Sequence, residues 1–366
     1  MRVISLPPVS DSEAQCGVVF RSAAFECLYK DRGSDTLLVT FNEMGMSANG
    51  RDCWGAVPAK RLNLSIFGFV STHPNWFPVE EILRCLEAFW KCLRNSRHKR
   101  VVVMGLSQGA YAALKFHRML GADISIAFAP QISIDPCDVK DLRFNQFFNS
   151  HSHNDMRIRS SDVSRRCYLF FDPFELDDIK HGRMLESLDN VTAIHLPFAG
   201  HAAVQIFLGS ENIWKLIEAC FAHDVARIRT LFGELRHTNP DRPHLIAQAV
   251  VGRRPAIAMA IFDAYGRSGM ESRWLHICWC LSEAGFGPRV IGWLREFLIA
   301  HPDHVSGREC LCLVAIRTGE RDLALALAQG LYESDPESSR RRYILDLAQR
   351  LSVHQNESSV RMGTEF

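Results

Sequence analysis

The strongest constraint on the fold is a buried strand that passes directly into a helix within residues 100–116. Residues 101–104 read Val-Val-Val-Met, a continuous apolar run typical of a strand covered on both faces. Gly105-Leu106-Ser107-Gln108-Gly109 follows, and the alanine-rich stretch 110–116 then predicts a helix. A serine between two glycines at this junction predicts a sharp turn that projects its hydroxyl from the end of the strand.

The same pattern has two simpler interpretations. The serine of a glycine-rich turn can merely cap the helix that follows it. A glycine-rich loop can also bind phosphate, but this run lacks the Gly-Lys-Ser/Thr ending of such loops. The buried strand before the motif and the helix after it favour an exposed nucleophile, Ser107.

Alternation of strands and helices predicts the fold class of the first two hundred residues. Helical patterns at 79–93, 110–120 and 181–188 lie between apolar runs. This order predicts an α/β fold, a mainly parallel sheet with helices on both faces. The predicted strands are 16–20, 25–29, 36–41, 64–70, 100–104, 124–128, 167–171 and 192–196.

The carboxyl ends of these strands carry a serine, an acid and a histidine in that chain order. Ligands of parallel α/β sheets bind at this edge. Ser107 needs a base to accept its proton, and His201, just after the last strand, is in place to do so. A carboxylate must then orient the imidazole and stabilise its protonated form.

Two aspartates compete for the role of the acid. Asp172 directly follows the strand 167–171, the usual position for such an acid, whereas Asp178 lies just before a predicted helix and could simply cap it. Asp177 and Glu175 are further alternatives. The sequence leaves this choice open.

Acyl transfer also requires two hydrogen-bond donors for the oxyanion. The backbone N–H of Gln108 directly follows the serine and predicts one of them. The second is expected from the loop after the third strand, around Asn42 and Glu43. The Asn42 side chain could contribute, or it could be an ordinary turn residue.

Taken together, these residues resemble the α/β-hydrolase superfamily over about residues 15–210. The resemblance rests on the 105–109 motif, on Asp172 or Asp178, and on Gly200-His201. It implies an α/β-hydrolase fold and an esterase, deacylase or related acyl-transfer activity. No metal and no organic cofactor are implied.

A narrower resemblance links the chain to bacterial hydrolases sometimes found near polysaccharide and glycan genes. Three features carry it: Asn75-Trp76-Phe77, the segment 127–136, and Phe171-Asp172-Pro173 with the segment 197–201. Such relatives usually read Ser-Met-Gly-Gly-Tyr at the turn, whereas this chain has Ser-Gln-Gly-Ala-Tyr at 107–111 and keeps the nucleophile. The substrate this implies is an acyl group on a small molecule, glycan or lipid.

A different architecture is predicted after residue 210. Strand patterns stop and helical patterns continue to about residue 351, with a spacing of 34 residues that is known from tetratricopeptide repeats. The residue pairs at this spacing are Pro302 and Pro336, Gly285 and Gly319, and Cys278 and Cys312. An irregular helical bundle is the alternative.

Three regions are therefore expected. They are an α/β-hydrolase domain (1–210), a tetratricopeptide-like helical domain (211–351) and a disordered tail (352–366). The helical domain is a candidate surface for a protein partner or for self-association.

Composition excludes several classes of protein. A net charge of +1 argues against nucleic-acid binding, and no apolar stretch reaches the length of a membrane span. The N-terminus lacks the apolar core of a signal peptide, which predicts a cytoplasmic protein with reduced thiols. The pairs Cys278/Cys280 and Cys310/Cys312 fall in predicted helices, where residues two apart do not share a face, so buried thiols are expected rather than a metal site.

The sequence thus predicts a serine esterase or deacylase that works through an acyl-serine intermediate. An acyltransferase with the same three residues is a close alternative. A hydrolase-like binding module without turnover is the competing class.

Overall fold

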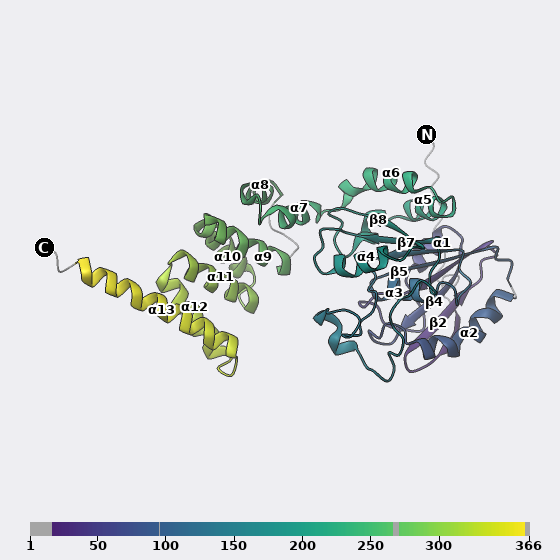
Figure 1. Cartoon of the computed structure of the whole chain (residues 1–366), viewed down its shortest axis with the longest axis horizontal. Coiled ribbons are helices and arrows are strands. Elements are labelled where there is room, and N and C mark those ends of the chain that lie inside the picture. Colours follow the sequence, from purple (N-terminus) through teal and green to yellow (C-terminus); the bar gives the residue numbers. More distant parts are fainter. Residues whose placement is uncertain (1–16, 95, 266–270, 363–366) are drawn as a thin grey trace. The chain divides into compact units, whose positions relative to one another are not determined.

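A computed structural model describes residues 17–94, 96–265 and 271–362 of the chain. The chain forms two compact units, the first reaching to Arg242 and the second beginning at Pro243 (Figure 1). The first unit contains the sheet, and the second is helical.

The first unit is built on one eight-stranded sheet with the order β1-β2-β4-β3-β5-β6-β7-β8. Strands β1, β2 and β4 pair antiparallel, and all other neighbours pair parallel. The predicted fold class, a mainly parallel sheet flanked by helices and followed by a helical region, is confirmed. The strands are β1 (Gly17–Arg21), β2 (Phe25–Lys30), β3 (Thr36–Phe41), β4 (Ser65–Ser71), β5 (Arg100–Leu106), β6 (Ile124–Phe128), β7 (Cys167–Phe171) and β8 (Val191–His195).

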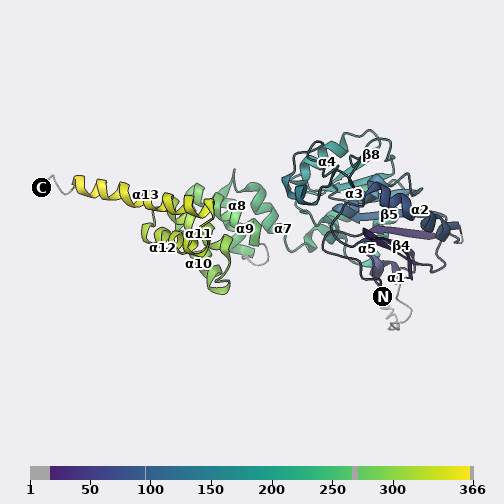
Figure 2. The same cartoon turned by 90° about the horizontal axis from the view of Figure 1, so that it is seen from below.

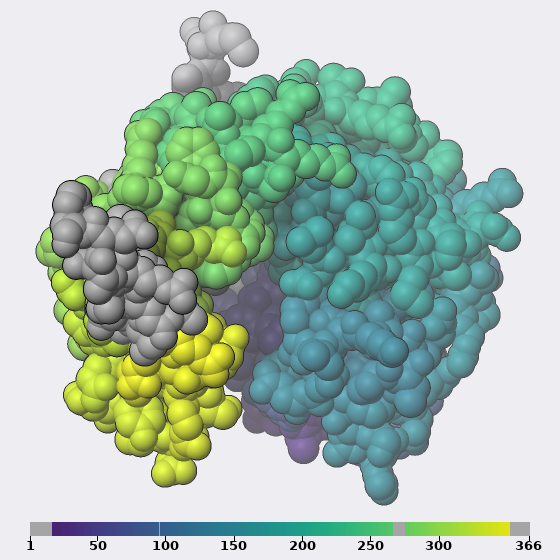
Figure 3. Space-filling view, turned by 60° about the vertical axis from the view of Figure 1, so that its left-hand side comes forward, coloured from purple at the N-terminus to yellow at the C-terminus, as the bar shows by residue number. Residues whose placement is uncertain are grey.

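Helices cover both faces of this sheet, as Figures 1 and 2 show. Successive strand residues point to opposite faces, so Val103 belongs to the apolar cluster that contains residues of α2, α3 and α4, whereas Val102 belongs to the one that contains residues of α1, α5 and α6. The helices of this unit are α1 (Ala56–Arg61), α2 (Val79–Arg94), α3 (Gln108–Lys115), α4 (Asp178–Glu186), α5 (Ser210–Phe221) and α6 (Val225–Leu235), with short 3-10 helices η2 (Leu142–Phe147), η3 (Ala203–Phe207) and η4 (Arg236–Thr238). In the space-filling view of Figure 3, blue and teal segments from the middle of the chain form much of the visible surface of this unit.

The predicted domain boundary at residue 210 lies inside the first unit. Leu216 and Leu231, in α5 and α6, are buried in the same apolar cluster as Phe128 of β6. The Tyr168 hydroxyl of β7 also donates a hydrogen bond to the carbonyl of Cys220, at 2.7 Å. These two helices therefore complete the cover of the sheet, and helical periodicity alone could not separate them from the helices that follow.

The second unit is a series of helices. From α8 onwards successive helices are in contact, and the buried residues of this unit form two apolar clusters. The helices are α7 (Arg242–Val250), α8 (Pro255–Tyr265), α9 (Glu271–Leu281), the π-helical turn η5 (Ser282–Phe286), α10 (Gly287–Ala300), α11 (Val305–Thr318), α12 (Arg321–Ser334) and α13 (Ser339–Met362). Helix α13 extends into the segment 352–366, for which composition predicts disorder.

The 34-residue spacing recurs in this second unit. Gly285 and Gly319 both adopt positive φ, 91° and 77°, at the turn between successive helices. Glu283 and Arg317, also 34 residues apart, form an ion pair of 3.1 Å. Equivalent positions of neighbouring helical pairs are thus in contact.

No helix in the described ranges is long and apolar enough to cross a membrane.

A buried histidine ties three segments of the first unit together. His117 Nδ1 lies 2.9 Å from the Ser125 hydroxyl, which itself donates to the carbonyl of Ala113, so Nδ1 carries the proton. His117 Nε2 accepts from the Ser164 hydroxyl at 2.8 Å. Burial, and to a lesser degree the charge of Arg118, lowers the pKa of His117 from 6.5 to about 4.

We expect this histidine to make the stability of the protein depend on pH. Because its pKa is lower in the folded chain, its contribution is complete above pH 6.5 and is lost as the pH falls toward 4. The free energy of unfolding should drop by about 2 kcal/mol between pH 7.5 and pH 5 from this group alone. Urea unfolding of the wild type and His117→Gln at several pH values measures it, and an equal pH dependence in both proteins would contradict the assignment.

Candidate active site

Strained backbone conformations gather at the carboxyl edge of the sheet. Ser107, after β5, has φ 55° and ψ −121°. Trp76 and Phe77 follow β4, Ala129 follows β6 and Phe198 follows β8, and all four have φ between 47° and 61°. Such conformations are costly for residues with a Cβ, and they cluster where a structure positions reactive groups.

The two glycines of the 105–109 motif are required by close backbone contacts. A Cβ on Gly105 would lie 2.2 Å from the carbonyl carbon of Gly109, and one on Gly109 would lie 2.3 Å from the carbonyl oxygen of Phe41. The N–H of Ser107 donates to the carbonyl of Phe128 at 2.9 Å, which ties the turn to β6. The predicted strand–turn–helix geometry is therefore present, with Ser107 at the junction of β5 and α3.

The structure brings His201 together with Asp178. His201 Nδ1 lies 2.7 Å from Asp178 Oδ2. The side chain of Asp178 is 2% exposed and that of His201 is 33% exposed. A carboxylate can only accept, so Nδ1 carries the proton of the neutral ring, and Nε2 is left as an acceptor.

Asp178 is placed by the start of helix α4. It is the first residue of that helix, and Asp177 precedes it at the N-cap without forming a side-chain capping bond. Asp178 therefore holds the imidazole rather than capping the helix, which was its alternative interpretation.

Asp172 has a different set of partners. Its carboxylate accepts hydrogen bonds from the backbone N–H groups of Phe174 (2.9 Å), Phe198 (3.1 Å) and Gly200 (2.8 Å). Phe198 and Gly200 both have positive φ, so this bonding holds a strained loop in shape. Asp172 thus supports the loop that carries His201, whereas Asp178 contacts the ring itself.

Next to Asp178 lies a group of polar side chains to which no motif in the sequence points. Arg143 Nη1 is 3.3 Å from Asp178 Oδ1, and Arg143 Nη2 is 2.7 Å from Asp141 Oδ2. His181 Nε2 is 2.9 Å from the same Asp141 oxygen. Burial alone would raise the pKa of Asp141, but the hydrogen bonds from Arg143 and His181 lower it to about 2.

The residues expected to bind an oxyanion divide into two kinds. Gln108 is the first residue of α3, where a backbone N–H has no acceptor within the helix. The side chain of Asn42, in contrast, is fully buried, and its nitrogen is bonded to the carbonyls of Glu43 and Met46 and to the Ser71 hydroxyl. This amide fixes the turn after β3 against β4, which agrees with the interpretation of Asn42 as a turn residue, and its role as an oxyanion donor stays a prediction.

The side chain of Gln108 also has a structural role. Its Oε1 lies 3.2 Å from the N–H of Asn75 and 3.4 Å from that of Trp76, and its Nε2 lies 3.3 Å from the Ser71 hydroxyl. This bonding links the serine turn to the strained segment after β4.

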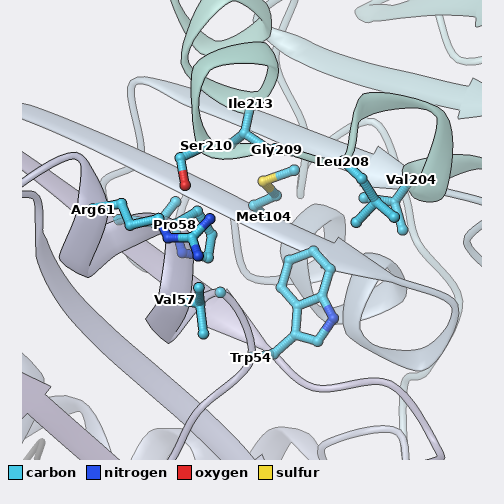
Figure 4. Close-up of a pocket in the computed structure, with 12 residues that line it drawn as sticks. Trp54, Val57, Pro58, Arg61, Met104, Val204, Leu208, Gly209, Ser210 and Ile213 are labelled. Carbon is cyan, nitrogen blue, oxygen red and sulfur yellow. The ribbon is translucent and has the colours of Figure 1, made fainter. Parts of the chain in front are cut away.

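A separate apolar cavity of about 380 Å³ lies on the face of the sheet covered by α1 and α5. Figure 4 shows that Met104 of β5 points into it, with Trp54 and Val57 on one side and Val204 on the other. Neither Ser107 nor His201 lines it. Its full lining is Leu38, Trp54, Gly55, Val57, Pro58, Arg61, Met104, Val204, Leu208, Gly209, Ser210 and Ile213.

No group of three or more His, Cys, Asp or Glu side chains in the described part of the chain is arranged to hold a metal ion.

Comparison with known proteins finds similarity in solved structures only. No family model and no curated protein matches the chain. An esterase of Pyrococcus furiosus is 17% identical, covering 57% of this chain and 89% of its own, with a TM-score of 0.37. The capsule O-acetyltransferase of Neisseria meningitidis serogroup A is 13% identical over 54% and 92%, with a TM-score of 0.41. A putative esterase from Staphylococcus aureus is 12% identical over 61% and 88%, with a TM-score of 0.38.

The close contact at Gly109 predicts a severe effect of a single methyl group. Gly109→Ala places its Cβ against the backbone of Phe41 and should cost at least about 3 kcal/mol or prevent folding. Gly233→Ala is the matched control, because no atom lies within 4 Å of the added Cβ and the residue is inside helix α6. The control should raise stability by up to about 1 kcal/mol. Thermal unfolding of both variants measures the difference, and equal stability would contradict the geometry.

Proposed function

We propose that this protein is a serine hydrolase or acyltransferase of the α/β-hydrolase type, with Ser107, His201 and Asp178 as its catalytic residues. The observation that carries the proposal is the 2.7 Å contact between His201 Nδ1 and the buried carboxylate of Asp178. This contact leaves His201 Nε2 as the proton acceptor. It lies at the same edge of the sheet as the strained serine.

The proposed reaction begins with proton transfer from the Ser107 hydroxyl to His201 Nε2 as the oxygen attacks the carbonyl carbon of an ester. Asp178 stabilises the imidazolium that forms. The oxyanion accepts a hydrogen bond from the N–H of Gln108, at the N-terminus of α3, where the helix dipole also favours negative charge. The loop after β3 would supply the second donor from its backbone, at Glu43.

The tetrahedral intermediate then collapses to an acyl-serine. The C–O bond to the alcohol breaks, and the imidazolium returns its proton to the leaving alkoxide. Water, or the hydroxyl of a second substrate, then attacks the acyl group while His201 again accepts a proton. The acyl C–O bond to Ser107 breaks, and the imidazolium returns this proton to the Ser107 oxygen. Hydrolysis and acyl transfer differ only in this acceptor.

We also propose roles for the two remaining regions. The sequence resemblance to hydrolases near polysaccharide genes makes acyl groups on glycans or lipids the first substrates to test. The helical unit is proposed to be a tetratricopeptide-like array, a candidate surface for a protein partner or for self-association. The left-handed glycines at 285 and 319 and the Glu283–Arg317 ion pair support it.

Active-site labelling tests the nucleophile. A fluorophosphonate probe reacts only with a serine activated by a neighbouring base, so we expect it to label the wild-type protein at one residue. Ser107→Ala should abolish labelling. Folding of both proteins is checked by circular dichroism, and a folded wild type that takes up no probe would overturn the proposal.

A pair of variants distinguishes the two aspartates. Asp178→Asn removes the charge that stabilises the imidazolium and should lower kcat by about 10⁴-fold. Asp172→Asn keeps that pair intact but weakens the bonds to the backbone of the His201 loop. It should therefore lower stability by about 1–3 kcal/mol and activity much less.

Both effects are measured with an activated aryl ester and by thermal unfolding. The opposite result, with Asp178→Asn active and Asp172→Asn folded but inactive, would assign the acid to Asp172.

A further inference from the structure

We infer that Arg143 is a positioning residue that sets the charge balance of the Asp178–His201 pair and keeps the site active at lower pH. This inference rests on the proposed function. It concerns residues that no motif in the sequence points to.

The first observation is geometric. The two oxygens of Asp178 are shared between two partners, with Oδ2 at 2.7 Å from His201 Nδ1 and Oδ1 at 3.3 Å from Arg143 Nη1. Arg143 in turn has three contacts of 2.7–3.1 Å from its guanidinium to the carboxylate of Asp141. The guanidinium thus bridges two buried carboxylates, and only one of them faces the imidazole.

The second observation concerns His181, which closes the chain of contacts. Its Nδ1 accepts from the N–H of Ile132 at 3.2 Å, so its Nε2 carries the proton and donates to Asp141. The ring is fully buried, and burial lowers its pKa. His181 is therefore neutral, and it fixes Asp141 as an acceptor without adding charge.

The third observation is the charge balance that results. Asp141 is ionised, and the pKa of Arg143 is raised because the bonds and charges of Asp141, Asp178 and Asp177 outweigh its burial. The Arg143–Asp141 pair carries no net charge, but its positive end faces Asp178. This orientation draws negative charge away from Asp178 Oδ2. The electrostatic attraction between Asp178 and a protonated His201 is therefore weaker.

Other charged groups lie near the pair, among them Arg242, whose Nη1 donates to the carbonyl of Pro197 at 2.9 Å in the loop that carries His201. Asp177 Oδ2, on the turn before α4, is 4.0 Å from Arg143 Nη1. Lys140 and Lys180 line a surface cavity of about 480 Å³ together with Arg143. Asp172, below the His201 loop, accepts bonds from three backbone N–H groups.

The consequence is a specific pH effect. A base catalyst must be neutral, so the activity of the site falls on the acid side when His201 becomes protonated. Arg143 opposes that protonation, whereas Asp141 screens Arg143 and so favours it. Removing the two residues singly should therefore shift the acid limb of the pH–rate profile in opposite directions.

The experiment is the rate of fluorophosphonate labelling of the full chain between pH 4.5 and pH 9. Labelling reports the activation of Ser107 whether the acceptor is water or another alcohol. We expect Arg143→Met to move the acid limb up by about one pH unit and Asp141→Asn to move it down. Arg143→Lys, which keeps the charge, should return the limb toward the wild-type position.

Controls distinguish this effect from the loss of any nearby positive charge and from unfolding of the variant. Lys180→Met removes a positive charge from the same cavity without touching Asp178 or Asp141 in the described residues, and it should leave the limb in place. The double variant Arg143→Met/Asp141→Asn removes both charges, and the acid limb of its pH–rate profile should lie between those of the single variants. Circular dichroism at each pH confirms folding.

Two failures are distinguishable. A wild type that takes up no label at any pH overturns the proposed function itself. Labelling of the wild type with both single variants shifted in the same direction, or with neither shifted, would overturn the role of Arg143 and leave the proposed function standing.

Discussion

The close approach of the serine turn to strand β3 is the constraint on which the rest of the structure depends. Gly109 packs its Cα against the carbonyl of Phe41, and Gly105 packs against Gly109, with no space for a Cβ at either position. This approach forces Ser107 into a left-handed conformation and brings α3 up against the sheet. The N–H at the start of α3 then faces the same edge from which the serine projects.

The sheet converts separate strand ends into one site. Strands β5, β6, β7 and β8 lie side by side in this order and are all parallel, so Ser107, Asp172 and the His201 loop reach the same edge from distant parts of the chain. At this edge the two aspartates bond different parts of the same loop. Asp172 satisfies the backbone of the strained loop, and Asp178 bonds the ring that the loop presents. Burying a carboxylate costs free energy unless hydrogen-bond donors replace water, and both aspartates have such donors.

The predictable parts of this protein were those encoded by local patterns. Apolar runs identified the strands, and the motif at 105–109 identified the turn, because backbone crowding leaves glycine as the residue that fits. The position of His201 after the last strand followed from topology. The choice between Asp172 and Asp178 did not, since it depends on the path of the chain after β7, which no spacing encodes.

Three features required the structure. The side-chain nitrogen of Asn42 is hydrogen-bonded to carbonyls of its own turn, and the presence of an asparagine in the sequence does not predict these partners. Arg143, Asp141 and His181 meet only through tertiary packing, and each looks like an ordinary surface or helical residue in the sequence. Helices α5 and α6 have the same periodicity as those of the second unit, but they cover the sheet.

The central claim is that Ser107 forms a covalent acyl intermediate with the help of His201 and Asp178. The most direct measurement is peptide mapping by mass spectrometry of the wild-type protein, quenched in acid after brief exposure to an activated acetyl ester. The account predicts one acetyl group per chain, on Ser107. An acetyl group found instead on the exposed thiol of Cys137, or on no residue of a folded protein, would contradict it.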